Sequence, residues 1–235
     1  LDRQVGDDLI CVPDASRSAL MASLSKLPLS SGPRSAAVTW DLLSSLTGGA
    51  LAVYIVAHMA LVGSVLLGVG VYDTMAEALE SSGVAQIDGP LVFAVFLVHF
   101  LAAGRKVPLR WTEHTLVWRQ TRMLRHSETW LWLGQALTGM VLLLLGGIHM
   151  WSVLTDLPIT AAKSSERIAH PAWFVFYVLL ICAVTGHAFV GLYRSGIKWG
   201  AVVRRKRATA RRFFLAGAGV LGLLGLITLV RFLYV

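Results

Sequence analysis

Four histidines lie inside four separate apolar stretches of the sequence, with one histidine in each stretch. His58 lies in AVYIVAHMALVG, His99 in AVFLVHFLAA, His149 in LLLLGGIHMW and His187 in CAVTGHAFVG. Ionisable side chains are costly in the hydrocarbon layer of a membrane and usually mark a functional path there. A hydrogen bond between helices would explain one such histidine, but four on successive helices need a common explanation. Neutral imidazole is a good ligand for iron, so these residues are predicted to be the axial ligands of two b-type haem groups.

The composition places these stretches in a membrane protein. Of the 235 residues, 56% are hydrophobic and 14% are charged, and the mean hydropathy is +0.67, which is not typical of a soluble domain. A transmembrane helix needs about 20 predominantly apolar residues. Five segments qualify, and they predict an all-α polytopic membrane bundle with helices at 43–72, 89–106, 128–154, 171–196 and 211–233. The second segment is short and is expected to extend into its flanks.

The chain is expected to divide into a cytoplasmic N-terminal segment, 1–40, and a five-helix dihaem transmembrane domain, 41–235. Residues 1–40 hold no early apolar core followed by a small-residue cleavage site, so a cleavable signal peptide is not expected. Cys11 and Cys182 are too far apart in the sequence to form a zinc or iron–sulfur site alone. Cys182 is expected to be a small buried side chain in the fourth span.

The charges of the loops predict the orientation of the helices. Segments 105–125 and 194–212 are rich in arginine and lysine, whereas the loop between the first two spans carries only acidic charges, at Asp73, Glu77, Glu80 and Asp88. The positive-inside rule therefore places the N-terminus and both basic loops in the cytoplasm. We expect a multi-pass protein of the bacterial cytoplasmic membrane. This topology explains most of the formal net charge of +8, so the bilayer rather than nucleic acid is the expected partner.

Depth along the helices pairs the four histidines. With a rise of about 1.5 Å per residue, His99 lies about 9 Å from the inner boundary of the membrane, and His187 lies about 10 Å from it. By the same rise, His58 lies about 25 Å and His149 about 31 Å from that boundary. The sequence thus predicts an inner pair, His99 and His187, and an outer pair, His58 and His149. Two imidazoles on one iron leave no open position, which suits electron transfer rather than oxygen chemistry.

The remaining histidines have simpler interpretations. His114 and His126 fall in the basic inner loop, and His170 lies at the outer start of the fourth span, so solvation or helix capping explains all three. A proton relay is the main competing interpretation of the four intramembrane histidines. Such a relay normally also uses Asp or Glu within the bilayer, and the five spans carry essentially none away from their ends.

Four pieces of the sequence resemble one known family of membrane anchors. The pieces FAVFLVHFLAAGRKVP, MLRHSETWLWLGQALTGM, LGGIHMW and GHAFVGLYRSGIKWG are similar to the single-chain, five-helix, dihaem cytochrome b subunit of quinol:fumarate reductases and succinate:quinone reductases. The resemblance runs from Trp40 to Arg212 and includes all four histidines. It implies that the chain passes electrons between menaquinol and a cytoplasmic iron–sulfur subunit, which carries a flavoprotein where fumarate and succinate interconvert. It also implies heterotrimers that can pair as dimers.

A quinone site near the outer haem is also expected, because oxidation of a quinol releases two protons together with two electrons. Glu80 lies 22 residues after His58, about where similar anchors place a glutamate important for menaquinol oxidation. Glu80 is therefore the predicted proton acceptor. Glu77 is a rival for this role, and a solvated acidic loop is the alternative interpretation of both residues.

Further residues receive a role from the resemblance. His99 and His187 would hold the haem nearer the iron–sulfur subunit. Arg194 and Lys198 could pair with haem propionates, although ordinary positive-inside charge explains them as well, and Trp132 could line a haem edge or belong to the interfacial aromatic belt. Some members carry a glutamate two residues before the inner histidine of the fourth span, where this chain has Thr185. Without that acid, proton release on the outer side could leave turnover electrogenic.

Two other functions stay open at the level of sequence. The cytochrome b subunit of a membrane hydrogenase or formate dehydrogenase would also place bis-histidine haem groups in a helical bundle. A haem-free, proton-coupled transporter is the alternative from another class of protein, and an optical spectrum of the purified chain distinguishes it.

Overall fold

The computed structural model describes residues 34–107, 111–124 and 126–235, and these ranges contain helices and turns but no β-strand. Five helices are long and apolar enough to cross a membrane. They are α2 (Arg34–Gly63), α4 (Val84–Gly104), α6 (Ser127–Leu154), α8 (Pro171–Lys198) and α9 (Arg207–Phe232). The prediction of an all-α bundle with five spans is therefore confirmed. Residues 40–235 form one compact unit, and residues 1–39 belong to another.

The first span differs from its predicted bounds. Helix α2 ends at Gly63 and is followed by a short 3-10 turn, Ser64–Leu66, and not by a continuous helix to residue 72. Gly68 has a φ of 141°, a backbone conformation that residues with a Cβ rarely adopt. The chain turns there, and a separate helix, α3 (Val69–Ser81), begins. The second span does extend into its flank, because α4 begins at Val84 and contains Pro90.

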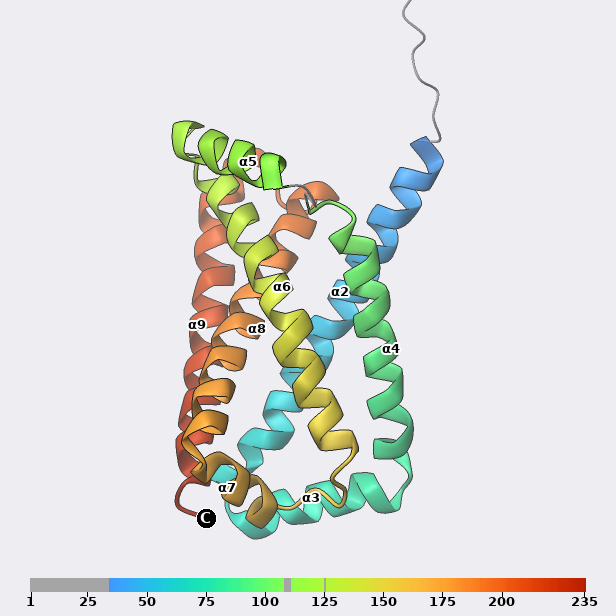
Figure 1. The fold of residues 1–235 in the computed structure, drawn as a ribbon, viewed down its shortest axis with the longest axis vertical. Coiled ribbons are helices and arrows are strands. Elements are labelled where there is room, and N and C mark those ends of the chain that lie inside the picture. The colour runs from blue at the N-terminus through green and yellow to red at the C-terminus, as the bar shows by residue number, and fades with distance from the viewer. Residues whose placement is uncertain (1–33, 108–110, 125) are drawn as a thin grey trace, which may run out of the picture. The chain divides into compact units, whose positions relative to one another are not determined.

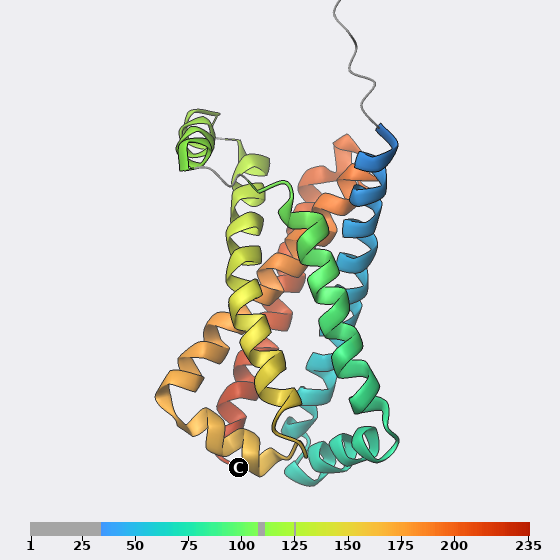
Figure 2. The same cartoon turned by 45° about the vertical axis from the view of Figure 1, so that its right-hand side comes forward.

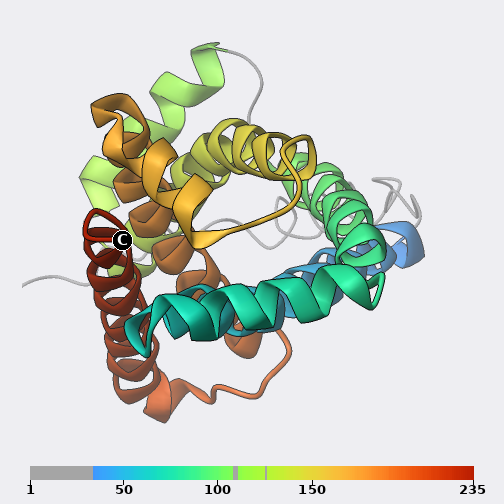
Figure 3. The same ribbon diagram turned by 90° about the horizontal axis from the view of Figure 1, so that it is seen from below.

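Short helices occupy the connections between the long ones. Helix α3 and helix α7 (Ala161–Ala169) lie across the same end of residues 40–235, roughly at right angles to the long helices (Figures 1 and 3). We call this the capped end. Helix α5 (Trp111–Leu124) lies at the opposite end, where α4 ends and α9 begins (Figure 2). This opposite end carries the arginine- and lysine-rich segments, and we call it the basic end.

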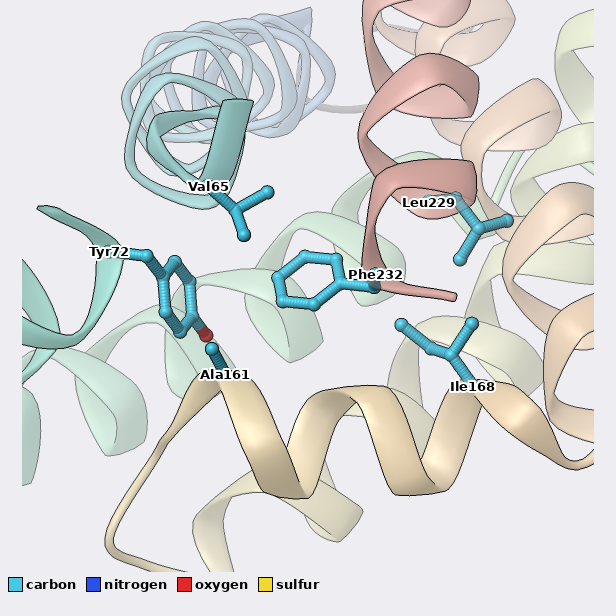
Figure 4. Packing of buried hydrophobic residues seen from close by; sticks show 6 residues of the cluster. All are labelled: Val65, Tyr72, Ala161, Ile168, Leu229 and Phe232. Atoms are coloured by element: carbon cyan, nitrogen blue, oxygen red, sulfur yellow. The ribbon is translucent and has the colours of Figure 1, made fainter. Parts of the chain in front are cut away.

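A cluster of buried side chains holds the cap onto the long helices. It comprises Val65, Tyr72, Ala161, Ile168, Leu229 and Phe232 (Figure 4). The ring of Tyr72 packs edge to face against Phe232, with ring centres 5.4 Å apart and an interplanar angle of 83°, an arrangement that aromatic rings favour. Because the cluster draws on the 3-10 turn, α3, α7 and α9, it fixes both short helices at the end of the bundle.

Carboxylates add polar ties at the capped end. Asp73 accepts a hydrogen bond from the Ala161 backbone N–H at 2.7 Å, where α7 begins. Asp156 pairs with Lys163 at 2.7 Å and with Arg167 at 2.5 Å. These contacts join α3 to the connection between α6 and α8, so the cap is held by charged as well as apolar contacts.

Candidate functional site

A cavity of about 920 Å³ lies among the five long helices, and residues of α3 and α7 line it at the capped end. Its lining includes all the predicted site residues, which are His58, Glu80, His99, Trp132, His149, His187, Arg194 and Lys198. Binding sites for cofactors and other small molecules are typically roughly 300–1,000 Å³ in volume. The structure therefore brings these residues, far apart in the sequence, to one internal space.

The four histidines meet in two pairs inside this cavity. The ring centres of His99 and His187 are 6.4 Å apart with an interplanar angle of 88°. Those of His58 and His149 are 6.0 Å apart with an angle of 69°. Two imidazoles that bind one metal ion from opposite sides have ring centres about 6 Å apart, because each metal–nitrogen bond is about 2 Å long. Both separations fit that arrangement. We call His99 and His187 the basic-end pair, and His58 and His149 the capped-end pair.

Helix α2 fixes the ring of His99. Its Nδ1 lies 3.1 Å from the carbonyl oxygen of Ser44 and 3.1 Å from the hydroxyl of Thr47. A carbonyl oxygen can only accept, so Nδ1 carries the proton and donates it. The Thr47 hydroxyl itself donates to the carbonyl of Leu43 at 2.7 Å, which leaves its oxygen free to accept. Nε2 of His99 therefore keeps its lone pair, as a metal ligand requires.

Helix α6 fixes the ring of His187 in the same way. Nδ1 of His187 lies 3.1 Å from the carbonyl oxygen of Gln135 and 3.2 Å from the hydroxyl of Thr138. Thr138 in turn donates to the carbonyl of Gly134 at 2.7 Å. We call this arrangement, in which a carbonyl and a threonine three residues later hold one Nδ1–H, the histidine clasp.

A glycine follows the threonine in each clasp, and the close approach of the histidine requires it. A Cβ atom at Gly48 would lie 2.8 Å from Cε1 of His99, and one at Gly139 would lie 3.0 Å from Cε1 of His187. Real Cβ atoms make almost no contacts as short as the first, and the second is tighter than nearly all real Cβ contacts. Glycine therefore lets the imidazole ring lie directly against the helix backbone.

The clasps were not found from the sequence, although a signal for them exists. The tripeptide Leu-Thr-Gly occurs in α2 and again in α6, and in each helix a histidine follows 11 residues after the threonine. These histidines are the two members of the capped-end pair. Eleven residues of helix rise about 16 Å, which is the distance along the helices between the two pairs.

The capped-end pair has different surroundings. The ring of Tyr54 stacks on His58, with centres 5.8 Å apart and an interplanar angle of 18°, and Tyr177 contacts His149 edge to face at 5.6 Å. Nδ1 of His149 is buried and has no hydrogen-bond partner in the part of the chain that the structure describes. A buried polar atom without a partner costs about 1–3 kcal/mol, so this level of the cavity fits a site that a further group completes.

The donor set suits a haem better than a bare metal ion. Within residues 34–107, 111–124 and 126–235, no group of three or more His, Cys, Asp or Glu side chains comes together at a metal-binding distance. Each pair therefore offers two nitrogen ligands on opposite sides of a point. A porphyrin supplies four more nitrogens in the plane between them, so the residues present fit one haem at each level.

The predicted propionate partners lie at the basic end. Lys198 Nζ is 2.9 Å from a carboxylate oxygen of Asp41, and Asp41 also pairs with Arg105 at 2.6 Å and with Lys106. Three cations thus share one carboxylate, which leaves net positive charge beside the basic-end pair. Arg194 instead donates to the backbone carbonyl of Glu128 at 3.3 Å.

The acidic residues of the first loop separate into different environments. Glu80 lines the cavity, and its Oε1 accepts a hydrogen bond from the Ile159 backbone N–H at 2.5 Å. Glu77 is exposed on α3. The solvated-loop interpretation therefore describes Glu77 but not Glu80. Asp88, which the sequence places among the loop charges, lies in α4 and also lines the cavity.

Two of the histidines outside the four apolar stretches cap helices. His126 and His170 are the N-caps of α6 and α8, and each accepts a backbone N–H through Nδ1 at 3.3 Å.

Cys182 is exposed, so the expectation of burial is wrong. Its surface belongs to a membrane-crossing helix, where lipid can cover an apolar side chain. Thr185 is buried and donates to the Ile181 carbonyl at 2.8 Å. Cys11 lies outside the described residues.

Comparison with known proteins gives a consistent family. The sequence profile described as "Succinate dehydrogenase/Fumarate reductase transmembrane subunit" matches residues 112–227. The fumarate reductase cytochrome b subunit of Wolinella succinogenes is 30% identical over 201 residues, which are 80% of this chain and 78% of that protein. The corresponding subunit of Helicobacter pylori is 32% identical over 169 residues, 68% of this chain and 66% of that protein.

A shorter relative matches as well. The succinate dehydrogenase hydrophobic membrane anchor subunit of Archaeoglobus fulgidus is 34% identical over 87 residues, which are 36% of this chain and 74% of that protein. These matches agree with the five apolar helices and with the histidines that line the cavity among them. The chain therefore belongs to the family of cytochrome b membrane anchors of fumarate reductases and succinate dehydrogenases.

Proposed function

We propose that the chain is a dihaem electron-transfer subunit that connects a quinol, menaquinol by resemblance, to an iron–sulfur subunit. The observation that carries this proposal is the pair of facing histidines at each of two levels, with ring centres 6.4 Å and 6.0 Å apart. When bound, a haem at each level supplies a one-electron carrier. The related proteins belong to fumarate reductase and succinate dehydrogenase complexes, which favours this function over that of a hydrogenase or formate dehydrogenase subunit.

The histidines of each pair hold one haem, and their neighbours tune and orient it. At the basic end, the clasps keep Nε2 of His99 and His187 unprotonated and aimed across the cavity. Lys198, which pairs with Asp41, and Arg194 would offer positive charge to haem propionates. Trp132 lines the same cavity.

The basic end is proposed to face the cytoplasm. The positive-inside rule favours this orientation, because Arg105 and Lys106 lie at this end together with the run Arg204–Arg207, whereas the acidic residues of α3 lie at the capped end. The iron–sulfur subunit, and through it the flavoprotein where fumarate is reduced, would bind at the basic end. The bilayer is that of the bacterial cytoplasmic membrane, and the resulting heterotrimers can pair as dimers.

The quinol site is proposed at the capped end of the cavity, with Glu80 as a proton acceptor. Oxidation of a quinol breaks two O–H bonds and releases two electrons, so a base near the quinol lowers the barrier to oxidation. The Ile159 N–H that donates to Glu80 fixes the position of this carboxylate beside the cavity. The second carboxylate oxygen stays available to the quinol.

Replacement of Glu80 in the purified complex tests this function. Glu80→Gln keeps an oxygen that accepts the Ile159 N–H but removes the base. Fumarate reduction driven by quinol should fall about 100-fold, the usual worth of a general base. Reduction driven by an artificial donor to the iron–sulfur or flavoprotein subunit should persist, and both haem spectra should stay unchanged.

Asp73→Asn is the matched control. Asp73 makes the same kind of bond, to the Ala161 N–H at 2.7 Å, but is absent from the cavity lining. Its replacement should leave quinol oxidation near the wild-type rate. An equal loss of activity in both variants would show that Glu80 only holds the cap. Purified protein without a haem spectrum would contradict the proposed function and favour a haem-free transporter.

A further inference from the structure

The capped end of the cavity contains a second carboxylate that the function above does not use. Asp88, in α4, is partly buried and lines the cavity. It forms no hydrogen bond or ion pair with residues 34–107, 111–124 or 126–235, in contrast to Asp41, Asp73, Glu80 and Asp156. A carboxylate that is partly removed from water and has no protein partner is expected to face a ligand or ordered water.

The helix places Asp88 at the level of the capped-end pair. It precedes His99 by 11 residues on α4, which corresponds to about 16 Å along the axis. The same number of residues separates Thr47, in the clasp of His99, from His58 on α2. Asp88 therefore lies near the depth of His58. Tyr54, whose ring stacks on His58, lines the same cavity.

Asp88 follows Glu80 by eight residues, across the turn between α3 and α4. Gly83, with a φ of 77°, makes the turn between α3 and α4, and the Gln86 side chain donates to the Glu80 carbonyl at 3.2 Å. On the other side, a Cβ at Gly89 would lie 2.4 Å from Leu154 of α6, so α4 is packed tightly against α6 beside Asp88. The two carboxylates thus reach one cavity from the end of α3 and from α4.

A role at the helix N-terminus does not explain Asp88. Carboxylates stabilise a helix chiefly from its first turn, because the effect of the helix dipole falls off within that turn. Helix α4 begins at Val84 and has no acidic residue in its first turn, and Asp88 is the fifth residue of the helix.

We propose that Asp88 accepts the second proton of the quinol, while Glu80 accepts the first. This inference rests on the quinol oxidation proposed above. In the balanced step, both quinol O–H bonds break, one proton goes to each carboxylate, and the quinol becomes a quinone. The two electrons would leave singly to the one-electron carrier that the capped-end pair would hold. Two carboxylates can hold both protons at once, whereas a single carboxylate would have to release the first proton before it could accept the second.

The acid side of the pH profile distinguishes two bases from one. The test measures quinol-driven fumarate reduction by the intact complex, as kcat/KM, between acid and neutral pH. If both carboxylates must be ionised, log kcat/KM should rise with a limiting slope of about two in the wild type. In Asp88→Asn the rate should fall about 10- to 100-fold, as removal of a base predicts, and the limiting slope should fall to about one.

Other titratable groups also line the capped end of the cavity. They are Tyr54 and His58 on α2, Tyr72 and Glu80 on α3, His149 on α6 and Tyr177 on α8, with Asp156, Lys163 and Arg167 in the connection between α6 and α8. None of them is changed in Asp88→Asn, so a change of slope reports on Asp88. Haem spectra and artificial-donor activity of the variant should match those of the wild type, and Asp73→Asn should retain a slope of about two.

Each result bears on one of the two proposals. A normal rate and a slope of two in Asp88→Asn would overturn the role of Asp88, and loss of activity in Glu80→Gln alone would then leave the quinol function intact. An equal fall in artificial-donor activity would make Asp88 structural and also overturn its role. If Asp88→Asn assembles poorly, Asp88→Glu restores a carboxylate, and recovery of a slope of two supports the proposal. A wild-type complex that does not oxidise quinol would overturn the proposed function itself.

Discussion

The two histidine pairs occupy one cavity but are held by different kinds of contact. In the basic-end pair, each Nδ1–H is bound by a backbone carbonyl and a threonine hydroxyl of the neighbouring helix. In the capped-end pair, the rings contact Tyr54 and Tyr177, and Nδ1 of His149 has no partner within the described residues. One level is thus fixed by neutral hydrogen bonds of 3.1–3.2 Å, whereas the other is bordered by aromatic rings and ionisable side chains.

The contacts around each pair suit a different role. A clasp is made within one helix turn, so it depends little on loops or on pH, and it suits a level that only passes electrons. The capped-end level lies beside Glu80 and Asp88 and under a cap held by carboxylates. That level suits a reaction in which protons and electrons leave together.

Removal of a clasped histidine should have the largest effect. His99→Ala deletes a ligand at the basic end, so about one of two haems per chain should be lost while the capped-end haem stays spectroscopically present. Electron delivery to the iron–sulfur subunit should largely stop. A haemochrome assay and a reduced-minus-oxidised spectrum measure this, and adding His187→Ala should change little more because both residues serve one iron. Loss of both haems from a normally assembled complex would mean that the two levels are not independent.

An added methyl group should have an intermediate effect at the clasp. In Gly48→Ala, the new Cβ would lie 2.8 Å from Cε1 of His99, so the ring must shift, at a cost of about 1–3 kcal/mol. Release of the basic-end haem in denaturant should occur earlier than in the wild type.

The adjacent glycine provides the control for this substitution. A Cβ at Gly49 would have nothing within 4 Å, so Gly49→Ala should retain haem normally, and helix propensity even favours alanine by about 1 kcal/mol. If the two variants release haem alike, the close packing in the clasp does not matter for binding.

Acidification should have the smallest effect and should reach the capped end first. The hydrogen bond from Lys163 chiefly lowers the pKa of Asp156 below its usual 3.8, aided by the charges of Lys163 and Arg167. A lowered pKa in the folded state means that this contact stabilises the fold above the usual aspartate pKa and is lost as pH falls through the lowered value. Proteolysis of the α6–α7 connection should therefore increase slightly at acid pH, before haem spectra at the clasped level change.

Asp156→Asn removes the titrating group and should abolish this pH dependence. The variant should show the same weak protection of the α6–α7 connection at all pH values in the range. A pH response that persists in Asp156→Asn would have to come from other carboxylates of the cap, with Asp73 and Glu80 the first to examine.

Much of the bundle and of its pairing could be predicted from apolar length and helix rise. Apolar length and helix rise depend on side-chain type and spacing alone. The sequence is therefore enough to pair His99 with His187 and His58 with His149. The histidine clasps could not be predicted in this way. Their main acceptors are the backbone carbonyls of Ser44 and Gln135, and because every residue has a carbonyl, residue type does not single these two out. The early end of α2 was missed because nothing in the apolar pattern shows the positive φ of Gly68.

The Leu-Thr-Gly repeat means that α2 with α4 and α6 with α8 are built to one plan, as a duplicated pair of helices would be. The two copies agree at the clasp but not at the far level. Eleven residues before the clasped histidine, the first copy has Asp88 and the second has Phe176, whose ring packs with Trp173 and Tyr177. Asp88 lines the cavity, whereas Phe176 is absent from the cavity lining. If Asp88 accepts a proton from the quinol as proposed, the asymmetry between the copies would make the bundle one-sided for protons, while the matching clasps keep it near-symmetric for electrons.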